Sequence, residues 1–351
     1  MKQILIIGPS WIGDMVMAQS LFRCLRAQDA ELAIDVLAPE WCRALLAAMP
    51  EVRAALPLPI AHGELALGKR RRLGRELRAR GYDQAIVLPN SFKSALLPWF
   101  AGIVLRTGWR GEARGLLLND CRVLDKTRYP LMAQRFAALG YAPGAALPDP
   151  LPWPRLQPDV EAARRVCETL HLRTDQPVLV LCPGAEFGPA KQWPQTHYAA
   201  VARHYLARGW QVWLLGSRKD ALAAERILAD VPVDLRAQAH NLCGHTSLED
   251  AVLLLSQAAA VVSNDSGLMH VAAALARPLV VVYGSTSPGF TPPLAERVAT
   301  LSLALPCSPC FKRECPLQHL NCLRQLGPER VLAALDVLLR AVPGATEQLA
   351  G

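Results

Sequence analysis

Two short polar segments of the sequence directly follow apolar runs and carry side chains that could bind an anion or exchange a proton. The first is Ser263-Asn264-Asp265-Ser266-Gly267, which follows the apolar run 258–262 and precedes a small-residue helical segment that contains His270. At such a strand-to-helix turn Asp265 suits the N-cap position and leaves the next backbone amides uncovered, so the helix start attracts anions. An ordinary connection with a good N-cap would give the same pattern.

The second segment places a carboxylate, Asp14, behind the predicted first strand, residues 3–7, and a turn that Gly8 and Gly13 make permissive. In open α/β sheets ligands bind at the carboxyl ends of the strands, so Asp14 is a candidate functional residue. The alternative is that Asp14 caps the helix predicted over residues 15–27. The segment lacks both G-x-G-x-x-G and G-K-[ST], so its dinucleotide or P-loop signal is weak.

Polar side chains also follow the next apolar run, residues 83–88. Asn90, Ser91, Lys93 and Ser94 offer hydrogen-bond donors to a sugar or a phosphate. The segment 106–114 adds three arginines and Trp109, whose face could stack on a sugar ring. Each segment alone could be a surface loop, but together they are expected to line one edge of one sheet.

The elements that must position these side chains alternate between apolar runs and helical patterns, which is typical of parallel α/β sheets. A proline-rich stretch, residues 143–158, suits a linker between two domains. The sequence predicts an α/β fold with two Rossmann-like domains, residues 1–155 and 156–326, that face each other across a ligand-binding cleft. The strands expected first in the chain cover residues 3–7, 32–37 and 83–88, and those expected in the second domain cover 177–182, 210–215, 258–262 and 278–283.

Composition restricts the class of protein. The chain has 351 residues, of which 52% are hydrophobic, and a formal net charge of +8, with a pI near 9.1. The charge points to anionic partners such as a nucleotide, a phosphorylated lipid, a membrane surface or a nucleic acid. No apolar stretch approaches the roughly 18 to 20 residues of a spanning helix. The N-terminal apolar run ends at Gly8-Pro9 without a cleavage site, so we interpret it as the first strand of a cytoplasmic protein.

Residues 69–80 form the densest basic run, Lys-Arg-Arg-Arg-Leu-Gly-Arg-Glu-Leu-Arg-Ala-Arg. Leu73 and Leu77 keep one face of a predicted helix apolar while the arginines cover the rest. Such a run is either a solvated helix face or a contact for anionic lipid headgroups or a phosphorylated acceptor. No aromatic residues are interleaved with it, which argues against a nucleic-acid partner.

Five segments resemble, in the same order over about residues 1 to 295, the motifs of the ADP-heptose:lipopolysaccharide heptosyltransferases of glycosyltransferase family 9. They are residues 8–14, 88–95, 106–112, 182–194 and 263–270. The resemblance implies a GT-B fold and an inverting transfer of L-glycero-D-manno-heptose from ADP-heptose onto the first heptose of the lipopolysaccharide inner core. It also implies a heptosyl-Kdo2-lipid A acceptor, a cytoplasmic location with peripheral contact to the anionic inner membrane surface, and no cofactor for catalysis.

Carried over residue by residue, the resemblance makes Asp14 the general base that takes the proton of the acceptor hydroxyl. Lys191 would contact the donor phosphates, and the helix start at Ser266-Gly267 would hold the pyrophosphate through backbone amides, beside Asp265 and His270. The other donor-binding residues that it implies are Gly184, Ser217 and Asp220, and the acceptor-binding residues are Asn90, Ser91, Lys93, Arg106 and Arg110.

Four of the ten cysteines form a cluster, Cys307, Cys310, Cys315 and Cys322, at which the sequence departs from the enterobacterial members of the family. A C-x2-C-x4-C-x6-C pattern in a reducing compartment predicts a structural zinc site with four thiolates. Free thiols, disulfides and an iron–sulfur cluster are the alternatives. The other six cysteines lie in predicted helices or strands, where a reduced Cys is a small apolar residue.

The last segment, residues 327–351, begins with an apolar-striped helix from Pro328 to Val342, which the resemblance to GT-B enzymes places against the N-terminal domain.

Three other functions are alternatives to heptose transfer. A nicotinamide-dependent oxidoreductase should show G-x-G-x-x-G with a following acidic residue, which this chain lacks. A different ADP- or UDP-sugar transferase of the same fold, and a non-catalytic basic protein that binds lipopolysaccharide or a membrane surface through residues 69–80, both stay open.

Overall fold

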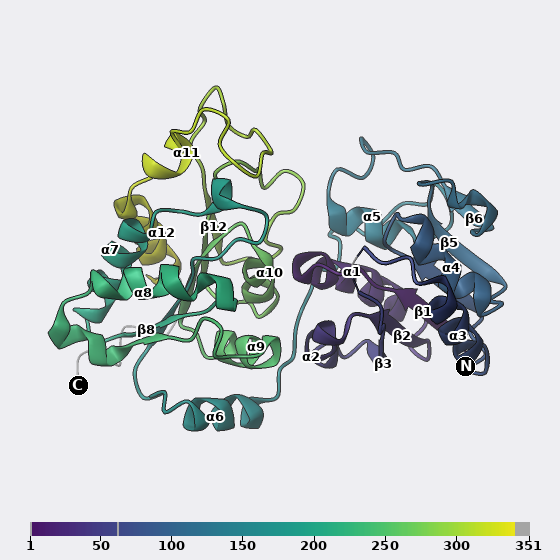
Figure 1. The fold of residues 1–351 in the computed structure, drawn as a ribbon, viewed down its shortest axis with the longest axis horizontal. Helices are drawn as coiled ribbons and strands as arrows, with labels where there is room; N and C mark the ends of the chain where they lie inside the picture. Colours follow the sequence, from purple (N-terminus) through teal and green to yellow (C-terminus); the bar gives the residue numbers. More distant parts are fainter. Residues whose placement is uncertain (1, 62, 341–351) are drawn as a thin grey trace. The chain divides into compact units, whose positions relative to one another are not determined.

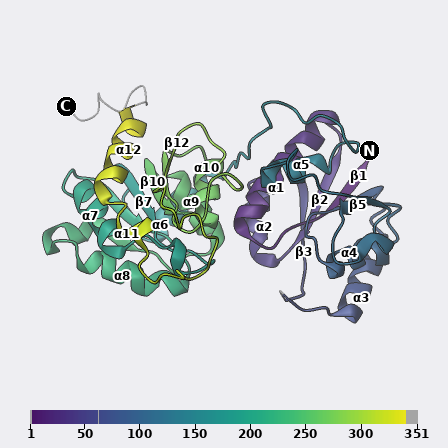
Figure 2. The same ribbon diagram turned by 90° about the horizontal axis from the view of Figure 1, so that it is seen from above.

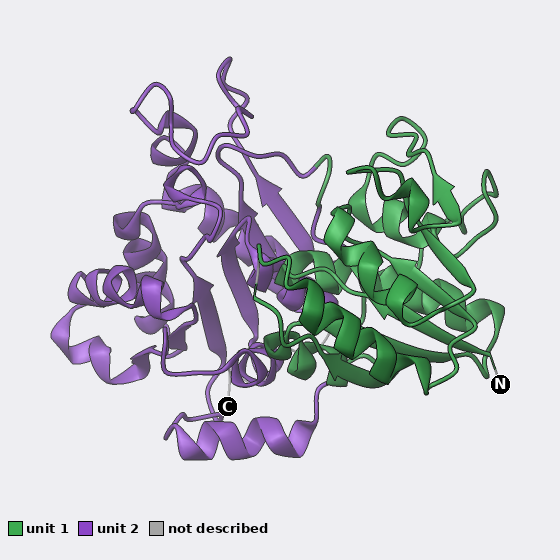
Figure 3. Ribbon diagram, turned by 45° about the vertical axis from the view of Figure 1, so that its right-hand side comes forward, with its two compact units in different colours: residues 1–157, 289–291 green, residues 158–288, 292–351 purple. Residues whose placement is uncertain are grey.

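The computed structural model describes residues 2–61 and 63–340 and divides the chain into two compact units (Figure 3). Unit 1 comprises residues 1–157 and 289–291, and unit 2 comprises residues 158–288 and 292–351. The division after residue 157 lies two residues beyond the predicted domain boundary. The short segment 289–291 joins unit 1 because the main-chain N–H of Met132 donates to the carbonyl of Phe290, at 3.1 Å.

Unit 1 is built on a parallel six-stranded sheet of order β3-β2-β1-β4-β5-β6 (Figure 1). Its strands are β1 (Gln3–Ile7), β2 (Ala33–Ala38), β3 (Val52–Pro57), β4 (Gln84–Val87), β5 (Leu105–Trp109) and β6 (Asp120–Arg122). Its helices are α1 (Ile12–Gln28), α2 (Arg43–Ala47), α3 (Leu67–Arg78), α4 (Phe92–Phe100) and α5 (Met132–Ala138), with short 3-10 turns η1 (Glu40–Cys42) and η2 (Arg114–Leu116). Helices α1 and α5 lie side by side (Figure 2), and α3 packs on α4.

Unit 2 repeats this plan with the strand order β12-β11-β10-β7-β8-β9, again fully parallel. Its strands are β7 (Val178–Cys182), β8 (Gln211–Leu214), β9 (Ala239–Asn241), β10 (Ala260–Asn264), β11 (Leu279–Val282) and β12 (Val298–Leu301). Its helices are α6 (Val160–Thr169), α7 (Gln195–Leu206), α8 (Ala221–Ala229), α9 (Leu248–Ser256), α10 (Gly267–Ala274), α11 (Asn321–Arg324) and α12 (Pro328–Arg340), with 3-10 turns η3 (Pro189–Lys191), η4 (Arg218–Asp220) and η5 (Val233–Gln238).

Both sheets have the order of a doubly wound Rossmann sheet, in which the first strand lies at the centre and the chain then winds outward in both directions. The first strand is β1 in unit 1 and β7 in unit 2, and their residues are almost entirely buried. Parallel strands covered on both faces by helices require continuous apolar sequence, which explains why these runs were visible in the sequence. The prediction of two Rossmann-like α/β domains is confirmed.

Helix α12 packs on α7 and on strands β10, β11 and β12 of its own unit. The prediction that the C-terminal segment also packs on the N-terminal domain stays a prediction. Val331 and Leu335, one turn apart, are fully buried in the core of unit 2, so the apolar stripe of the helix is already covered there. The end of the predicted segment, residues 341–351, lies outside the described residues.

In the described ranges, 2–61 and 63–340, no helix combines the length and the apolar character that crossing a membrane requires.

The packing of α12 predicts that Leu335→Ala destabilises unit 2 by about 2 to 5 kcal/mol, because the substitution leaves a cavity under a fully buried side chain. The measurement is the midpoint of urea unfolding, followed by circular dichroism. Val337→Ala on the same helix is the control, since Val337 is 70% exposed. An equal, small effect of both substitutions would contradict this packing of the helix.

Candidate functional site

Several of the predicted site residues follow the carboxyl ends of four central strands, two in each unit. Asp14 follows β1 and Asn90 follows β4, and these two strands are neighbours in the first sheet. Lys191 follows β7 and Asp265 follows β10, which are neighbours in the second sheet. At each pair the chain reverses its direction of winding, so the loops diverge and leave room for a ligand.

Asp14 is the third residue of α1 and is partly buried. Burial raises the pKa of its carboxyl group to about 6. Its side chain makes no hydrogen bond or ion pair with any residue that the structure describes. The N-cap position of α1 is occupied by Trp11, so the alternative that Asp14 is the helix cap is wrong. A carboxylate without a partner and with a pKa near 6 is suited to accept a proton near neutral pH.

The polar residues that follow β4 lie around the start of α4. The side-chain carbonyl of Asn90 accepts a hydrogen bond from Arg114, at 2.9 Å. Ser91 is the N-cap residue of α4, and its hydroxyl makes no capping hydrogen bond. Lys93 is partly buried in the first turn of that helix. The three residues therefore present an amide, a hydroxyl and a cation at the same strand end as predicted.

The two predicted acceptor arginines differ in their surroundings. Arg106, in β5, donates from its guanidinium to the main-chain carbonyls of Ile103 and Leu117, at 2.5 and 2.6 Å. These bonds give Arg106 a structural role in the loops around β5, and its geometry gives no support to an acceptor contact. Arg110 is exposed directly after β5 and is anchored through its main-chain N–H to the carbonyl of Arg122.

In unit 2 the predicted donor residues Lys191 and Asp265 form an ion pair, with 2.6 Å between the ammonium nitrogen and a carboxylate oxygen. The hydroxyl of Thr286 donates to the same oxygen, also at 2.6 Å. His270 is buried beside this pair, and burial lowers the pKa of its imidazole to about 4. The histidine is therefore neutral at physiological pH, and one cation and one carboxylate set the charge of this cluster.

The start of α10 differs from the predicted arrangement in one residue. Ser266 is the N-cap and Gly267 the first helical residue, so the prediction that Asp265 is the N-cap is wrong. The Asp265 carboxylate is instead held by Lys191 and Thr286, while the Ser266 side chain makes no capping hydrogen bond. No side-chain cap thus covers the first-turn amides of α10, which is the arrangement of an anion site at a helix N-terminus.

Gly184, Ser217 and Asp220 meet at the ends of β7 and β8. One oxygen of the Asp220 carboxylate accepts from both the main-chain N–H and the hydroxyl of Ser217, each at 2.8 Å. A Cβ atom on Gly184 would lie 2.5 Å from that carboxylate, so only glycine leaves room for it. The structure brings these three predicted residues together.

Comparison with known proteins decides the family. The family model described as glycosyltransferase family 9 (heptosyltransferase) matches residues 70–321. The chain belongs to glycosyltransferase family 9. It is 50% identical over 342 residues to lipopolysaccharide heptosyltransferase 2 of Escherichia coli (strain K12), covering 96% of this chain and 98% of that one. It is 51% identical over 342 residues to the protein of the same name from Salmonella typhimurium, with the same coverage of both chains.

The solved structure of E. coli ADP-heptose lps heptosyltransferase II superposes on this family 9 enzyme with a TM-score of 0.87 and 49% identity, over 97% of this chain and 99% of that one. The predicted GT-B fold class is thereby confirmed. The chain is a glycosyltransferase.

Two aromatic side chains of the family 9 enzyme were missed by the sequence reasoning. Trp11 precedes Asp14 by three residues and is 50% exposed, and Phe92 at the start of α4 is 40% exposed. They follow the neighbouring strands β1 and β4, so they accompany the polar residues at that edge. Trp109, for which a sugar-stacking role was predicted, is buried and donates its indole N–H to the carbonyl of Arg135.

Two buried polar side chains that hold the strand ends were also missed. Asn264, the last residue of β10, bonds to the loop after β7. Arg114 bonds to the loop after β4 and to Trp109, the last residue of β5. Asn264 could have been identified in the sequence as a polar residue at the end of an apolar strand. No sequence feature distinguishes Arg114 from the other arginines near it.

The four clustered cysteines lie on one long loop, residues 302–320, and on the following helix α11; we call residues 302–320 the cysteine loop. None of the four forms a disulfide bond. Within residues 2–61 and 63–340, no three His, Cys, Asp or Glu side chains are arranged so that they could hold a metal ion.

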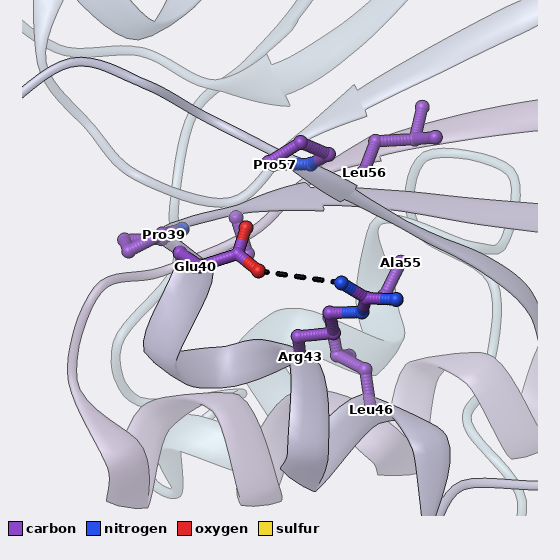
Figure 4. A pocket seen from close by; sticks show the side chains of 8 residues that line it. Pro39, Glu40, Arg43, Leu46, Ala55, Leu56 and Pro57 are labelled. Atoms are coloured by element: carbon purple, nitrogen blue, oxygen red, sulfur yellow. Dashed lines mark hydrogen bonds and ion pairs between the residues drawn. The ribbon is translucent and has the colours of Figure 1, made fainter.

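A pocket in unit 1 lies away from the predicted residues (Figure 4). An ion pair between Glu40 and Arg43 lies beside it, with 3.5 Å between the charged atoms. The pocket is lined by Ala38, Pro39, Glu40, Arg43, Leu46, Ala55, Leu56 and Pro57. None of the site residues predicted from the sequence is among them, so the pocket is not assigned to the site.

Proposed function

We propose that this family 9 enzyme moves L-glycero-D-manno-heptose from ADP-heptose onto the first heptose of the lipopolysaccharide inner core, with inversion at the anomeric carbon and heptosyl-Kdo2-lipid A as the acceptor. The observation that carries this proposal is Asp14, a partly buried carboxylate with a raised pKa at the central strand end of unit 1. Identity of 50% to lipopolysaccharide heptosyltransferase 2 of E. coli supports heptose as the transferred sugar and lipopolysaccharide as the acceptor class.

In the proposed reaction Asp14 takes the proton of the acceptor hydroxyl while the oxygen of that hydroxyl attacks the anomeric carbon of the donor. The bond between that carbon and the β-phosphate oxygen breaks, and its electron pair leaves with ADP. The uncapped start of α10 and the ammonium group of Lys191 then stabilise the negative charge on the diphosphate. These groups belong to the chain itself, so we propose that catalysis needs no metal cofactor.

We further propose that Asp220 binds the ribose of ADP-heptose. Its second carboxylate oxygen makes no hydrogen bond with a described residue, because both bonds from Ser217 go to the first. Gly184 keeps the space next to this carboxylate open. Asp265 and His270 would lie beside the diphosphate or the sugar, Asp265 chiefly by orienting Lys191.

For the acceptor we propose contacts from Asn90, Ser91, Lys93 and Arg110, which present donors and cations to a phosphorylated core sugar. Trp11 would pack an aromatic face against the sugar next to Asp14, since it is exposed and close to it in the chain. Arg106 would act only by shaping the loops around β5 that carry Arg110. The cleft between the two domains stays a prediction.

We also propose that the enzyme works in the cytoplasm, in peripheral contact with the anionic inner membrane surface through α3. The apolar positions of the predicted basic helix, Leu73 and Leu77, point inward as expected. Arg71 and Arg75 are exposed and form no ion pair with any described residue. Such cations attract anionic lipid headgroups, each by about 1 kcal/mol.

Exposed apolar side chains accompany these arginines. Helix α3 crosses the end of α4, where a Cβ on Gly74 would lie 2.5 Å from that of Phe100, and Arg78 donates to the carbonyl of Phe100 at 3.2 Å. Trp99 is 47% and Val104 is 79% exposed on this same stretch. A basic helix next to an exposed Trp is the composition of surfaces that bind at a membrane interface.

Finally, we propose that the cysteine loop binds a structural zinc ion through Cys307, Cys310, Cys315 and Cys322. Main-chain N–H groups of residues 317–320 donate to the Cys315 sulfur and lower its pKa, which favours a thiolate. Burial raises the pKa of Cys322, and the charges of the other three cysteines add to this, so each of the three lies within electrostatic reach of Cys322. Zinc binding would require the thiols to close around the metal.

Transfer is tested by incubating the enzyme with ADP-heptose and a one-heptose core acceptor and detecting one added heptose by mass spectrometry. Asp14→Asn is expected to bind ADP-heptose normally and to lose transfer by about a hundredfold or more, since the base is removed. Because the carboxyl pKa is about 6 and only the deprotonated form accepts a proton, the rate should rise with pH through this value. Full transfer by Asp14→Asn would remove Asp14 as the base.

Membrane contact is tested by co-sedimentation with vesicles. The enzyme is expected to bind vesicles that contain phosphatidylglycerol, and the double variant Arg71→Glu/Arg75→Glu should bind at least about tenfold more weakly. The control is Arg208→Glu/Arg226→Glu, which makes the same charge change at exposed positions of unit 2. Equal binding by both variants would exclude α3 as the contact, and binding that requires the lipid A acceptor in the vesicles would assign the arginines to the acceptor instead.

Zinc is tested by elemental analysis of enzyme purified under reducing conditions without chelators. About one zinc ion per chain is expected, and Cys310→Ser or Cys315→Ser should lose it, because four thiolates complete the site. Cys121→Ser, at a partly buried cysteine outside the loop, should keep it. Enzyme from zinc-supplemented cells that contains no metal would leave the cluster as free thiols.

A further inference from the structure

The cysteine loop is attached directly to the loop that carries Lys191; we call residues 183–194 the donor loop. The main-chain N–H of Ala190 donates to the carbonyl of Arg313, at 3.0 Å. A Cβ on Gly188 would lie 2.5 Å from the same carbonyl oxygen, and Gly188 has a φ of +149°, which L side chains rarely adopt. This close approach fixes Arg313 beside the donor loop.

The side chain of Arg313 lies on the same aromatic ring as that of Lys191. The centre of the guanidinium is 5.5 Å from the centroid of the Phe187 ring, and the Lys191 nitrogen is 4.9 Å from that centroid. Both distances are in the range of cation–π contacts. Phe187 thus holds a second cation next to the one for which phosphate binding is proposed.

Two other cations around the donor loop are paired with carboxylates, whereas Arg313 has no such partner among the described residues. The charge of Lys191 is balanced by Asp265, and that of Lys219 is paired with Glu186 at 3.0 Å. His270 is neutral because burial lowers its pKa. Arg313 is exposed and has no acidic partner among the described residues. A diphosphate that meets only the Lys191–Asp265 pair would find little net positive charge.

We infer that Arg313 binds the diphosphate of the nucleotide-sugar donor and stabilises the negative charge of the departing ADP. The inference rests on the proposed function for the identity of the donor. A guanidinium presents two parallel N–H donors to phosphate oxygens, which a single ammonium cannot do. As the glycosidic bond breaks and its electron pair moves onto the β-phosphate oxygen, these donors meet the growing charge. The cysteine loop therefore contributes to the donor site through one side chain.

The test measures the affinities of the full-length enzyme for ADP and for adenosine by isothermal titration calorimetry. Arg313→Ala is expected to weaken ADP binding by about tenfold to a hundredfold, the usual effect of losing a hydrogen bond to a charged group. Adenosine binding should not change, because adenosine carries no phosphate. Arg313→Lys should recover part of the loss. The matched control is Lys312→Ala, which removes the neighbouring exposed cation and should leave both affinities unchanged.

Two results would overturn the inference. In the first, Arg313→Ala binds ADP as well as Lys312→Ala does. In the second, ADP and adenosine weaken equally, which would mean that Arg313 only supports the fold of the donor loop. Because ADP is the probe, the experiment does not depend on the transferred sugar. If Arg313→Ala loses ADP affinity but the wild-type enzyme does not transfer heptose, the proposed sugar is rejected and the contact between Arg313 and the diphosphate is retained.

Discussion

The buried side-chain amide of Asn264 holds together the carboxyl ends of β7 and β10, and the donor half of the site depends on it. Its oxygen accepts from the main-chain N–H of Trp193 at 3.0 Å and from the hydroxyl of Tyr198 at 3.1 Å. Its nitrogen donates to the carbonyl of Pro183 at 2.6 Å. Both ends of the donor loop are thereby tied to one side chain, and Lys191 lies between them. Such a network stays in one arrangement because an unpaired buried group is costly.

Arg114 has the corresponding place in unit 1, with a charged group in place of a neutral one. Its buried guanidinium donates to the carbonyl of Trp109 at 2.9 Å and to the side chain of Asn90 at 2.9 Å, and also bonds to the carbonyl of Pro89. It therefore joins the ends of β4 and β5. Burial lowers its pKa, as expected for a cation whose partners are carbonyl and amide oxygens. Each half of the site is thus organised by one buried polar side chain at the strand ends.

The sequence predicted those parts of the fold that a repeating pattern of apolar residues determines by itself. Strands β1, β7 and β10 are buried on both faces, so their apolar runs were visible. Strand β5 was not predicted, because Arg106 and Thr107 make it look like a loop. The apolar stripe of α12 predicted a packed helix but carried no information on which sheet it packs against. The surroundings of Asp14 and Asp265 likewise depend on residues distant in the chain, so neither the raised pKa of Asp14 nor the ion pair of Asp265 could be read from spacing.

The separate organisation of the two halves has an evolutionary consequence. The residues proposed to bind the acceptor lie in unit 1, where Arg114 holds their loops in place. The residues proposed to bind the nucleotide lie in unit 2, where Asn264 has that role. Each network lies within its own unit: Arg114 bonds to Trp109 and Asn90, and Asn264 bonds to Trp193, Tyr198 and Pro183. On the proposed assignment, mutations in the β4 and β5 loops would change the residues that receive the acceptor sugar and would leave the hydrogen bonds of Asn264 around the nucleotide site in place.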